Sequence, residues 1–162
     1  MRGETEEHIE YRQNDREVRA TIVRVIADHL RPSAEYSWST SDFDFRTAHL
    51  EDVNLSKATF SGSARFDEAT FSGDARFDEA TFSGDAGFGG TIFSGNVLFS
   101  RATFFGNARF GGAIFSGYAV FGGAIFSGNA RLVRRGDLLR RRPVRRGDLL
   151  RRRFVREGEF RY

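Results

Sequence analysis

The residue types that most often carry chemistry are sparse in this sequence, and they lie outside the spacings that chemistry requires. The chain has no cysteine, which excludes a disulfide framework and a cysteine-based metal site. Its three histidines, His8, His29 and His49, are scattered without the spacing of metal ligands. No Ser/His/Asp or Cys/His arrangement and no phosphate-binding glycine loop stands out. The sequence therefore predicts no catalytic, cofactor-binding or metal-binding residues and a protein that is not an enzyme.

Paired carboxylates could serve general acid–base catalysis, but the acidic pairs of this chain follow a repeat. Asp67-Glu68 recurs one repeat later as Asp78-Glu79. Glycine pairs follow the same repeat, at Gly89-Gly90, Gly111-Gly112 and Gly122-Gly123. We therefore interpret both kinds of pair as solvent-exposed corners of a repeating structure.

The repeat is a ladder of phenylalanines with alternating spacings of six and five residues. A small residue precedes each of them by two positions; it is alanine except at Thr91 and Val97. One long and one short spacing together make a unit of eleven residues, as in ATFSGDARFDE. This unit recurs six times. The ladder consists of Phe60, Phe66, Phe71, Phe77, Phe82, Phe88, Phe93, Phe99, Phe104, Phe110, Phe115, Phe121 and Phe126.

A short fixed period indicates one structural unit stacked on copies of itself, because no unit can bury its apolar face alone. Residues two apart lie on the same side of an extended chain, so each Ala and Phe should point inward and the residue between them outward. A Ser-Gly corner follows each six-residue unit, where glycine is expected to supply a positive φ. The pattern predicts an all-β solenoid.

The ladder resembles the pentapeptide-repeat family, which implies a right-handed β-helix with four sides per coil. The preceding stretch fits the plain five-residue form at Phe43-Asp-Phe45, Ala48-His-Leu50 and Val53-Asn-Leu55. The ladder itself looks like a variant common in actinobacterial proteins, in which units of five and six residues alternate. The resemblance covers residues 43–132 and implies a bacterial protein with about four coils, a rod on the order of 19 Å long.

A helix is predicted before the repeats. Residues 1–14 are polar and are expected to be disordered; Asn14 or Asp15 could cap the helix, and Pro32 should end it. Residues 15–42 are thus predicted to be a capping helix and a lead-in segment, packed on the open end of the β-helix. A partner-binding helix is the alternative. One apolar stripe recurs at helical spacing, formed by Val18, Ile22, Val25, Ile26 and His29.

This helix and lead-in segment, with Trp38 and Phe43-Asp-Phe45, also resemble the segment before the repeats in many actinobacterial relatives. Some of those relatives carry further helices upstream, including membrane spans. The resemblance therefore suggests a shortened relative or a fragment.

The outward residues of the repeat sort onto four faces. Thr59, Thr81, Thr103 and Ile125 should share one face, with Thr70, Ile92 and Ile114 opposite. Arg65, Gly87 and Arg109 should form a third face, and Arg76, Leu98 and Val120 the fourth. Outward apolar residues gather in the later coils, which can mark a contact surface, although β-branched residues also simply suit strands. The candidate contact face is Ile92, Leu98, Ile114, Val120 and Ile125.

The tail, residues 133–162, looks like a frame-shifted copy of the repeat. Written in GC-rich codons and read two bases on, the ladder unit ARFGGAIFSGD becomes PVRRGDLLRR, the sequence of residues 143–152. This explains the Arg-Gly-Asp triplets at Arg135 and Arg146, which resemble adhesion motifs, and the arginine clusters. We expect a disordered basic tail, with weak helix around Leu138 and Leu149, that would bind nucleic acid only nonspecifically.

The part of the chain before the tail is acidic. The whole sequence has a net charge of +3, but residues 1–130 carry 12 basic and 18 acidic residues. No apolar run approaches the ~20 residues of a membrane span, and no signal peptide is evident. A cytoplasmic location is therefore expected.

These features favour a non-catalytic structural or protein-interaction module with an unknown protein partner, and a homodimer is a further candidate. The family resemblance supplies an alternative, a DNA mimic that binds topoisomerases such as gyrase. Mimicry needs a long acidic surface, whereas this short ladder mixes Arg65, Arg76, Arg101 and Arg109 among its acids. Two further alternatives are surface binding by the row Thr59, Thr81 and Thr103, as in ice-binding β-helices, and nucleic-acid binding through the tail.

Overall fold

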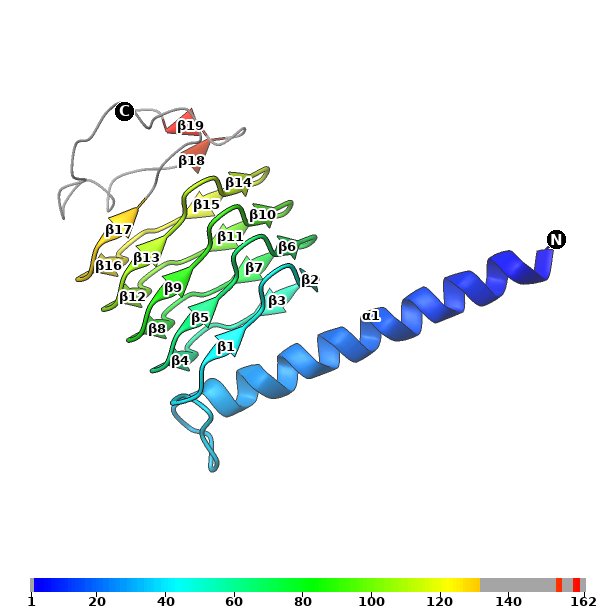
Figure 1. Cartoon of the computed structure of the whole chain (residues 1–162), viewed down its shortest axis with the longest axis horizontal. Coiled ribbons are helices and arrows are strands. Elements are labelled where there is room, and N and C mark those ends of the chain that lie inside the picture. Colours follow the sequence, from blue (N-terminus) through cyan, green and yellow to red (C-terminus); the bar gives the residue numbers. More distant parts are fainter. Residues whose placement is uncertain (1, 132–153, 156–158, 161–162) are drawn as a thin grey trace.

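The computed structural model describes residues 2–131, 154–155 and 159–160, with side chains from Arg12 to Arg131. Its main body is a four-sided β-solenoid of two-residue strands, each paired in parallel with strands one coil away (Figure 1). One helix, α1 (Arg2–Leu30), lies at the start of the solenoid (Figure 1). The structure thus confirms the solenoid that the repeat pattern predicts.

Four sheets form the sides of the solenoid, and the strands of each sheet follow one another in chain order. Sheet A contains β1 (Phe43–Asp44), β5 (Ala64–Arg65), β9 (Ala86–Gly87), β13 (Ala108–Arg109) and β17 (Ala130–Arg131). Sheet B contains β2 (His49–Leu50), β6 (Thr70–Phe71), β10 (Ile92–Phe93) and β14 (Ile114–Phe115). Sheet C contains β3 (Val53–Asn54), β7 (Ala75–Arg76), β11 (Val97–Leu98), β15 (Ala119–Val120), β18 (Phe154–Val155) and β19 (Glu159–Phe160). Sheet D contains β4 (Thr59–Phe60), β8 (Thr81–Phe82), β12 (Thr103–Phe104) and β16 (Ile125–Phe126).

The chain visits the sheets in the order A, B, C, D, so sheet A lies opposite sheet C and sheet B opposite sheet D. One coil is two ladder units: Thr59 pairs with Thr81, and Val53 pairs with Ala75. In the first coil the offset is one residue shorter, as in the pairing of Phe43 with Ala64. The reason is that plain five-residue units precede the ladder. The strands β1 to β16 thus make about four coils.

The phenylalanine ladder fills the core as four columns of stacked rings. In sheet D the ring centroids of Phe60, Phe82, Phe104 and Phe126 follow one another at 4.9, 4.8 and 4.7 Å. These planes are nearly parallel, and the centroid separation exceeds the ~3.5–4.0 Å contact distance of carbon atoms. The rings are therefore offset, which is the favourable arrangement for parallel aromatic rings. Every ladder phenylalanine is buried except Phe126 in the last coil, which is half-buried.

Columns on opposite sheets meet edge to face across the core. Phe88 of sheet A and Phe99 of sheet C have centroids 5.4 Å apart and planes at 84°. The single buried polar side chain among those described is Thr91, whose hydroxyl donates a hydrogen bond to the Phe66 carbonyl at 2.7 Å. The core is therefore aromatic and fully satisfied over the described residues, with no buried side-chain polar atom left unpaired.

The Ser-Gly corners need glycine for a reason that differs from the sequence prediction. None of these glycines has a positive φ; that conformation occurs at the corners of the five-residue units, for example at Glu68, Glu79 and Gly90. At the Ser-Gly corners the coils approach so closely that a Cβ has no room. A Cβ on Gly95 would lie 2.5 Å from the carbonyl oxygen of Gly73 one coil earlier. The expected positive φ at these corners was therefore wrong.

The helix α1 begins earlier than predicted, at Arg2 instead of Asn14 or Asp15. Residues 2–13 are rich in glutamate and arginine, which have high helix propensity and continue the helix without an internal stop. The end agrees with expectation: α1 stops at Leu30, and the residue before Pro32 is disfavoured in a helix. The structure thus has helix from Arg2 on where the sequence predicted a disordered segment over residues 1–14.

The apolar stripe predicted to pack on the solenoid faces water instead. Val18, Ile22 and Val25 are exposed, whereas Val23, Ala27 and Leu30 are buried against the first coil, beside β3. Both sets have helical spacing, but they lie on different sides of α1. Of the predicted stripe, Ile26 is half-buried against the core, and His29 stacks on Trp38 with ring centroids 4.0 Å apart. The choice of face was wrong because the sequence contains two apolar stripes.

The predicted disordered tail contains two strands where the structure describes it. β18 pairs antiparallel with β15 through Phe154 and Ala119, and β19 pairs with β18. The edge of sheet C therefore continues beyond the coils. The Arg-Gly-Asp triplets and the predicted weak helix lie outside the described residues.

We expect Phe88→Asp to unfold the solenoid. The Phe88 side chain is fully buried, with Phe66 and Phe110 stacked on its two faces at 4.9 Å. A buried unpaired carboxylate there should cost more than about 4 kcal/mol, a large part of a typical domain's stability. Thermal unfolding followed by circular dichroism measures this. Phe105→Asp is the matched control, since Phe105 is exposed; equal melting of the two variants would contradict the inward ladder.

We expect Gly95→Ala to destabilise the protein by roughly 1–3 kcal/mol, because its Cβ would overlap the Gly73 carbonyl. Gly122→Ala is the control: a Cβ at Gly122 meets nothing within 4 Å. That change should be neutral or slightly stabilising, since it reduces the entropy of the unfolded chain. Urea unfolding of both variants gives the comparison, and a harmless Gly95→Ala would refute the close-approach explanation.

Candidate functional site

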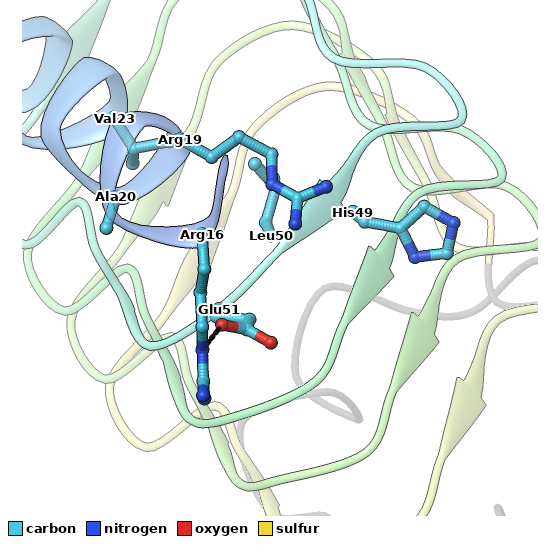
Figure 2. A pocket seen from close by; sticks show the side chains of 7 residues that line it. All are labelled: Arg16, Arg19, Ala20, Val23, His49, Leu50 and Glu51. Atoms are coloured by element: carbon cyan, nitrogen blue, oxygen red, sulfur yellow. Dashed lines mark hydrogen bonds and ion pairs between the residues drawn. The ribbon is translucent and has the colours of Figure 1, made fainter. Parts of the chain in front are cut away.

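The interior of the solenoid offers no room for a ligand among the described residues. The phenyl columns occupy it, and the cavity found is a hollow of about 10 Å³ between α1 and the first coil, lined by Arg16, Arg19, Ala20, Val23, His49, Leu50 and Glu51 (Figure 2). That space is about the size of one water molecule, far below the ~300–1,000 Å³ of a small-molecule site. An ion pair between Arg16 and Glu51 borders it (Figure 2). The hollow beside α1 is therefore too small for a small-molecule ligand.

The residues considered for metal binding or acid–base chemistry do not assemble. His29 contacts Trp38, and its Nδ1 lies 2.8 Å from the Tyr36 carbonyl oxygen, whereas His49 points outward from β2. His8 lies in the part of α1 whose side chains are not described. No group of three metal-ligating side chains occurs among the described residues.

The acidic pairs sit at corners and make contacts between coils. The Asp67 carboxylate accepts a hydrogen bond from the backbone N–H of Gly89 at 3.0 Å, one coil further on. Glu79 pairs with Arg101, also one coil further on, and the hydrogen bond from that guanidinium lowers the pKa of Glu79. At another corner, Asp74 accepts from the Asn96 backbone N–H at 2.9 Å. These acids therefore link successive coils.

The outward residues form rows along the four faces, and the rows are those that the sequence predicted. Thr59, Thr81, Thr103 and Ile125 align along sheet D. Along sheet B the row is His49, Thr70, Ile92 and Ile114, and along sheet C it is Asn54, Arg76, Leu98 and Val120. In the last two rows the polar residues belong to the early coils and the apolar residues to the later coils.

The structure brings four of the five candidate contact residues together. Sheets B and C are consecutive along the chain, so the rows with Ile92, Ile114, Leu98 and Val120 flank one edge of the solenoid (Figure 1). Ile125 lies on sheet D, on the opposite side from sheet B. Tyr118, 69% exposed, stands on the corner between β14 and β15 and joins the group. We call this set, Ile92, Leu98, Ile114, Tyr118 and Val120, the apolar edge.

Sequence reasoning missed two exposed aromatic residues of the solenoid. Tyr118 occupies a corner position where other units carry Asp, Asn or Ser, and Phe105 stands where they carry Ser. Aligning the units on their phenylalanines and searching the corner column for aromatic residues would have found both. The phenylalanine ladder concerns inward positions and carries no information on which residues stand at the corners.

Sheet A carries charges of both signs. Arg65, Arg109 and Arg131 point outward along it, while Asp67 lies over Gly87. At its first strand, Arg46 donates hydrogen bonds to Asp44 from Nε at 2.8 Å and from Nη2 at 2.6 Å. These side-chain hydrogen bonds lower the pKa of Asp44 to about 2. The face is thus neither a continuous acidic strip nor a continuous basic one.

Comparison with known families accounts for this repeat geometry. A sequence model described as pentapeptide repeats (9 copies) matches residues 45–92 and 88–134, which together exceed half of the chain. The chain belongs to the pentapeptide-repeat family. Searches of curated proteins and of solved structures found no match. Membership indicates a repeat-protein scaffold or interaction module, and no helix among the described residues has the length and apolarity to cross a membrane.

We expect Arg46→Ala to raise the pKa of Asp44 from about 2 toward its ordinary value of 3.8. Because the folded-state pKa lies below the unfolded one, the pair stabilises the fold above the ordinary value, and this contribution is lost as pH falls toward about 2. Carboxyl titration by NMR measures the shift. Arg76→Ala, on sheet C, should leave the Asp44 titration unchanged; a shift in both variants would remove Arg46 as the cause.

Proposed function

We propose that this pentapeptide-repeat protein is a non-catalytic interaction module that holds a protein partner on the apolar edge. The main evidence is that outward apolar side chains concentrate on one edge of the solenoid in the later coils. Ile114 is 53% exposed there, whereas the same row carries His49 and Thr70 in the earlier coils.

Strand propensity alone does not account for the apolar edge. β-branched residues suit strands whatever the function, and this explains Ile92, Ile114 and Val120 individually. Leu98 is not β-branched, and Tyr118 lies in a corner outside any strand. An exposed Tyr beside aliphatic residues is the composition of the central part of protein interfaces, which supports a contact surface.

The rigidity of the solenoid supports the same function. Apolar residues on neighbouring strands of one sheet stand about 4.8 Å apart, the spacing of hydrogen-bonded strands. A surface held at fixed spacing loses little conformational entropy on binding. The filled core and the absence of a ligand-sized cavity among the described residues favour a protein partner over a small molecule.

The DNA-mimic alternative has less support. It requires a continuous acidic surface, and Arg65, Arg76 and Arg109 point outward on sheets A and C. Gyrase supercoiling that is unaffected by excess protein would exclude it. Nonspecific nucleic-acid binding would depend on the tail, mostly outside the described residues, and would show a steep loss of affinity with salt. The cytoplasmic location remains a proposal that cell fractionation tests.

The test of the interaction function compares two surfaces of the same protein. A double variant, Ile114→Asp with Val120→Asp, changes the apolar edge; the control, Thr59→Asp with Thr103→Asp, changes two positions on sheet D that are two coils apart and do not pair with each other. Both should keep the wild-type melting transition, because all four side chains point outward. In affinity capture from cells that express the protein, the first variant should lose a specific partner by tenfold or more, as expected for hot-spot residues.

The control variant should retain that partner at the wild-type level. If both variants retain the same partners, or both lose them, the apolar edge is not the binding surface. A photo-crosslinking residue at position 118 gives an independent readout: it should form an adduct with the captured protein, and the same residue at position 81 should not.

A further inference from the structure

We propose that the outer edge of β15 is a β-augmentation site, a sheet edge to which an extended polypeptide segment adds as an antiparallel strand, and that the chain closes this site with its own β18 and β19. Strands β3, β7, β11 and β15 pair in parallel. In contrast, β18 pairs antiparallel with β15, with Phe154 opposite Ala119 (Figure 1). A further coil would pair in parallel, so β18 is an added strand and not part of another coil.

Backbone groups of β15 point toward this added strand. In sheet C the inward residue of each strand donates its N–H to the next coil: Val97 donates to the Tyr118 carbonyl oxygen at 2.8 Å, and Val53 and Ala75 make the equivalent bonds. Ala119 is the next residue of this column, so its N–H points away from the earlier coils. An edge of this kind is a template for another strand, and β18 lies opposite it.

The other three sheets end without such a strand. Sheets A, B and D end at β17, β14 and β16, and none of these has a strand on its outer side within the part of the chain that the structure describes. On sheet A, Ala130 is the equivalent of Ala119, because Ala108 one coil earlier donates its N–H to the Asn129 carbonyl oxygen at 2.9 Å. Ala119 and Ala130 therefore compare a covered edge with an uncovered one.

The sequence of the tail favours strands at the residues that pair. After Phe126 the only aromatic residues are Phe154, Phe160 and Tyr162, and Val155 is β-branched. Aromatic and β-branched residues suit strands, whereas the preceding tail is dominated by arginine and leucine. In addition, β19 pairs with β18 through Val155 and Glu159, so the added strand has a neighbour on its other side as well.

Covalent attachment closes the site in the isolated chain. A tethered strand has an effective concentration of roughly millimolar, so a free segment at micromolar concentration does not displace it. If β18 cannot pair, the same edge should accept a free segment. Backbone hydrogen bonds supply most of the affinity in strand addition, so the site should require free N–H groups in the incoming segment.

The first test is binding of a labelled peptide with the sequence of residues 152–162, followed by fluorescence anisotropy. Phe154→Pro combined with Val155→Pro in the full-length protein removes two backbone N–H groups and prevents β18 from pairing. This variant should bind the peptide at least about tenfold more tightly than wild type, because the tethered competitor is lost. The control, Leu149→Pro with Leu150→Pro, places its prolines before β18 and should bind as weakly as wild type.

A second peptide controls for charge. It carries prolines in place of Phe154 and Val155, has the same net charge as the first peptide, and should bind none of the three proteins. Equal binding of the two peptides would show electrostatic attraction and would overturn strand addition.

Hydrogen exchange followed by NMR tests the location. The Ala119 amide should exchange slowly in wild type, faster in the variant with prolines at 154 and 155, and slowly again when the first peptide is added. The Ala130 amide is the internal control, and its exchange should be the same in all three samples. Wild type alone already gives a comparison, since its Ala119 amide should be better protected than its Ala130 amide.

Equal affinity of wild type and the 154/155 variant for the first peptide, or no binding by either, would overturn the site. An Ala119 amide that exchanges at the same rate in both proteins would do so too. The proposed function of the apolar edge is tested by different variants, so either proposal can fail while the other stands.

Discussion

The stacking of phenyl rings at the spacing of hydrogen-bonded strands is the interaction on which the rest of this protein depends. Rings one coil apart, such as Phe77 and Phe99, have centroids 4.8 Å apart, and neighbouring strands lie about 4.7–4.9 Å apart. A single register, one full coil per step, therefore satisfies the backbone hydrogen bonds and the aromatic columns together. Within a strand a single inserted residue would exchange the inward and outward side chains, whereas the corners accept units of five and of six residues, since the first coil is one residue shorter than the next and keeps its pairing.

The close approach of successive coils governs what the corners accept. At the Ser-Gly corners the backbone of one coil lies where a Cβ of the next would stand, which leaves only glycine. At the other corners a positive φ recurs, and the protein places Glu68, Glu79 or Arg101 there as well as glycine. At corners of both kinds, acidic side chains accept hydrogen bonds from backbone N–H groups one coil further on, Asp67 from Gly89 and Asp85 from Asn107. Charged residues at corners thus hold coils in register, which weakens any catalytic interpretation of them.

Phenyl rings fill the core, and the corner residues hold successive coils together. The outer faces and the helix therefore remain for binding. The apolar edge is one such surface, and its side chains stand on strands of fixed spacing. Contiguous exposed apolar surfaces mark interaction sites on soluble proteins.

The sequence by itself determined the solenoid, the inward ladder and the four outward rows, because a short fixed period combined with the alternation of a strand leaves little freedom. It could not decide which side of α1 packs, since residues 18, 22 and 25 and residues 23, 27 and 30 both form helical stripes. Only the packing of the helix against the first coil shows that Val23, Ala27 and Leu30 are the buried side. The sequence also left the role of the corner glycines open, because the residues of one repeat do not reveal the contacts between coils. The tertiary structure decided these points by bringing together atoms that lie one full coil apart in the chain.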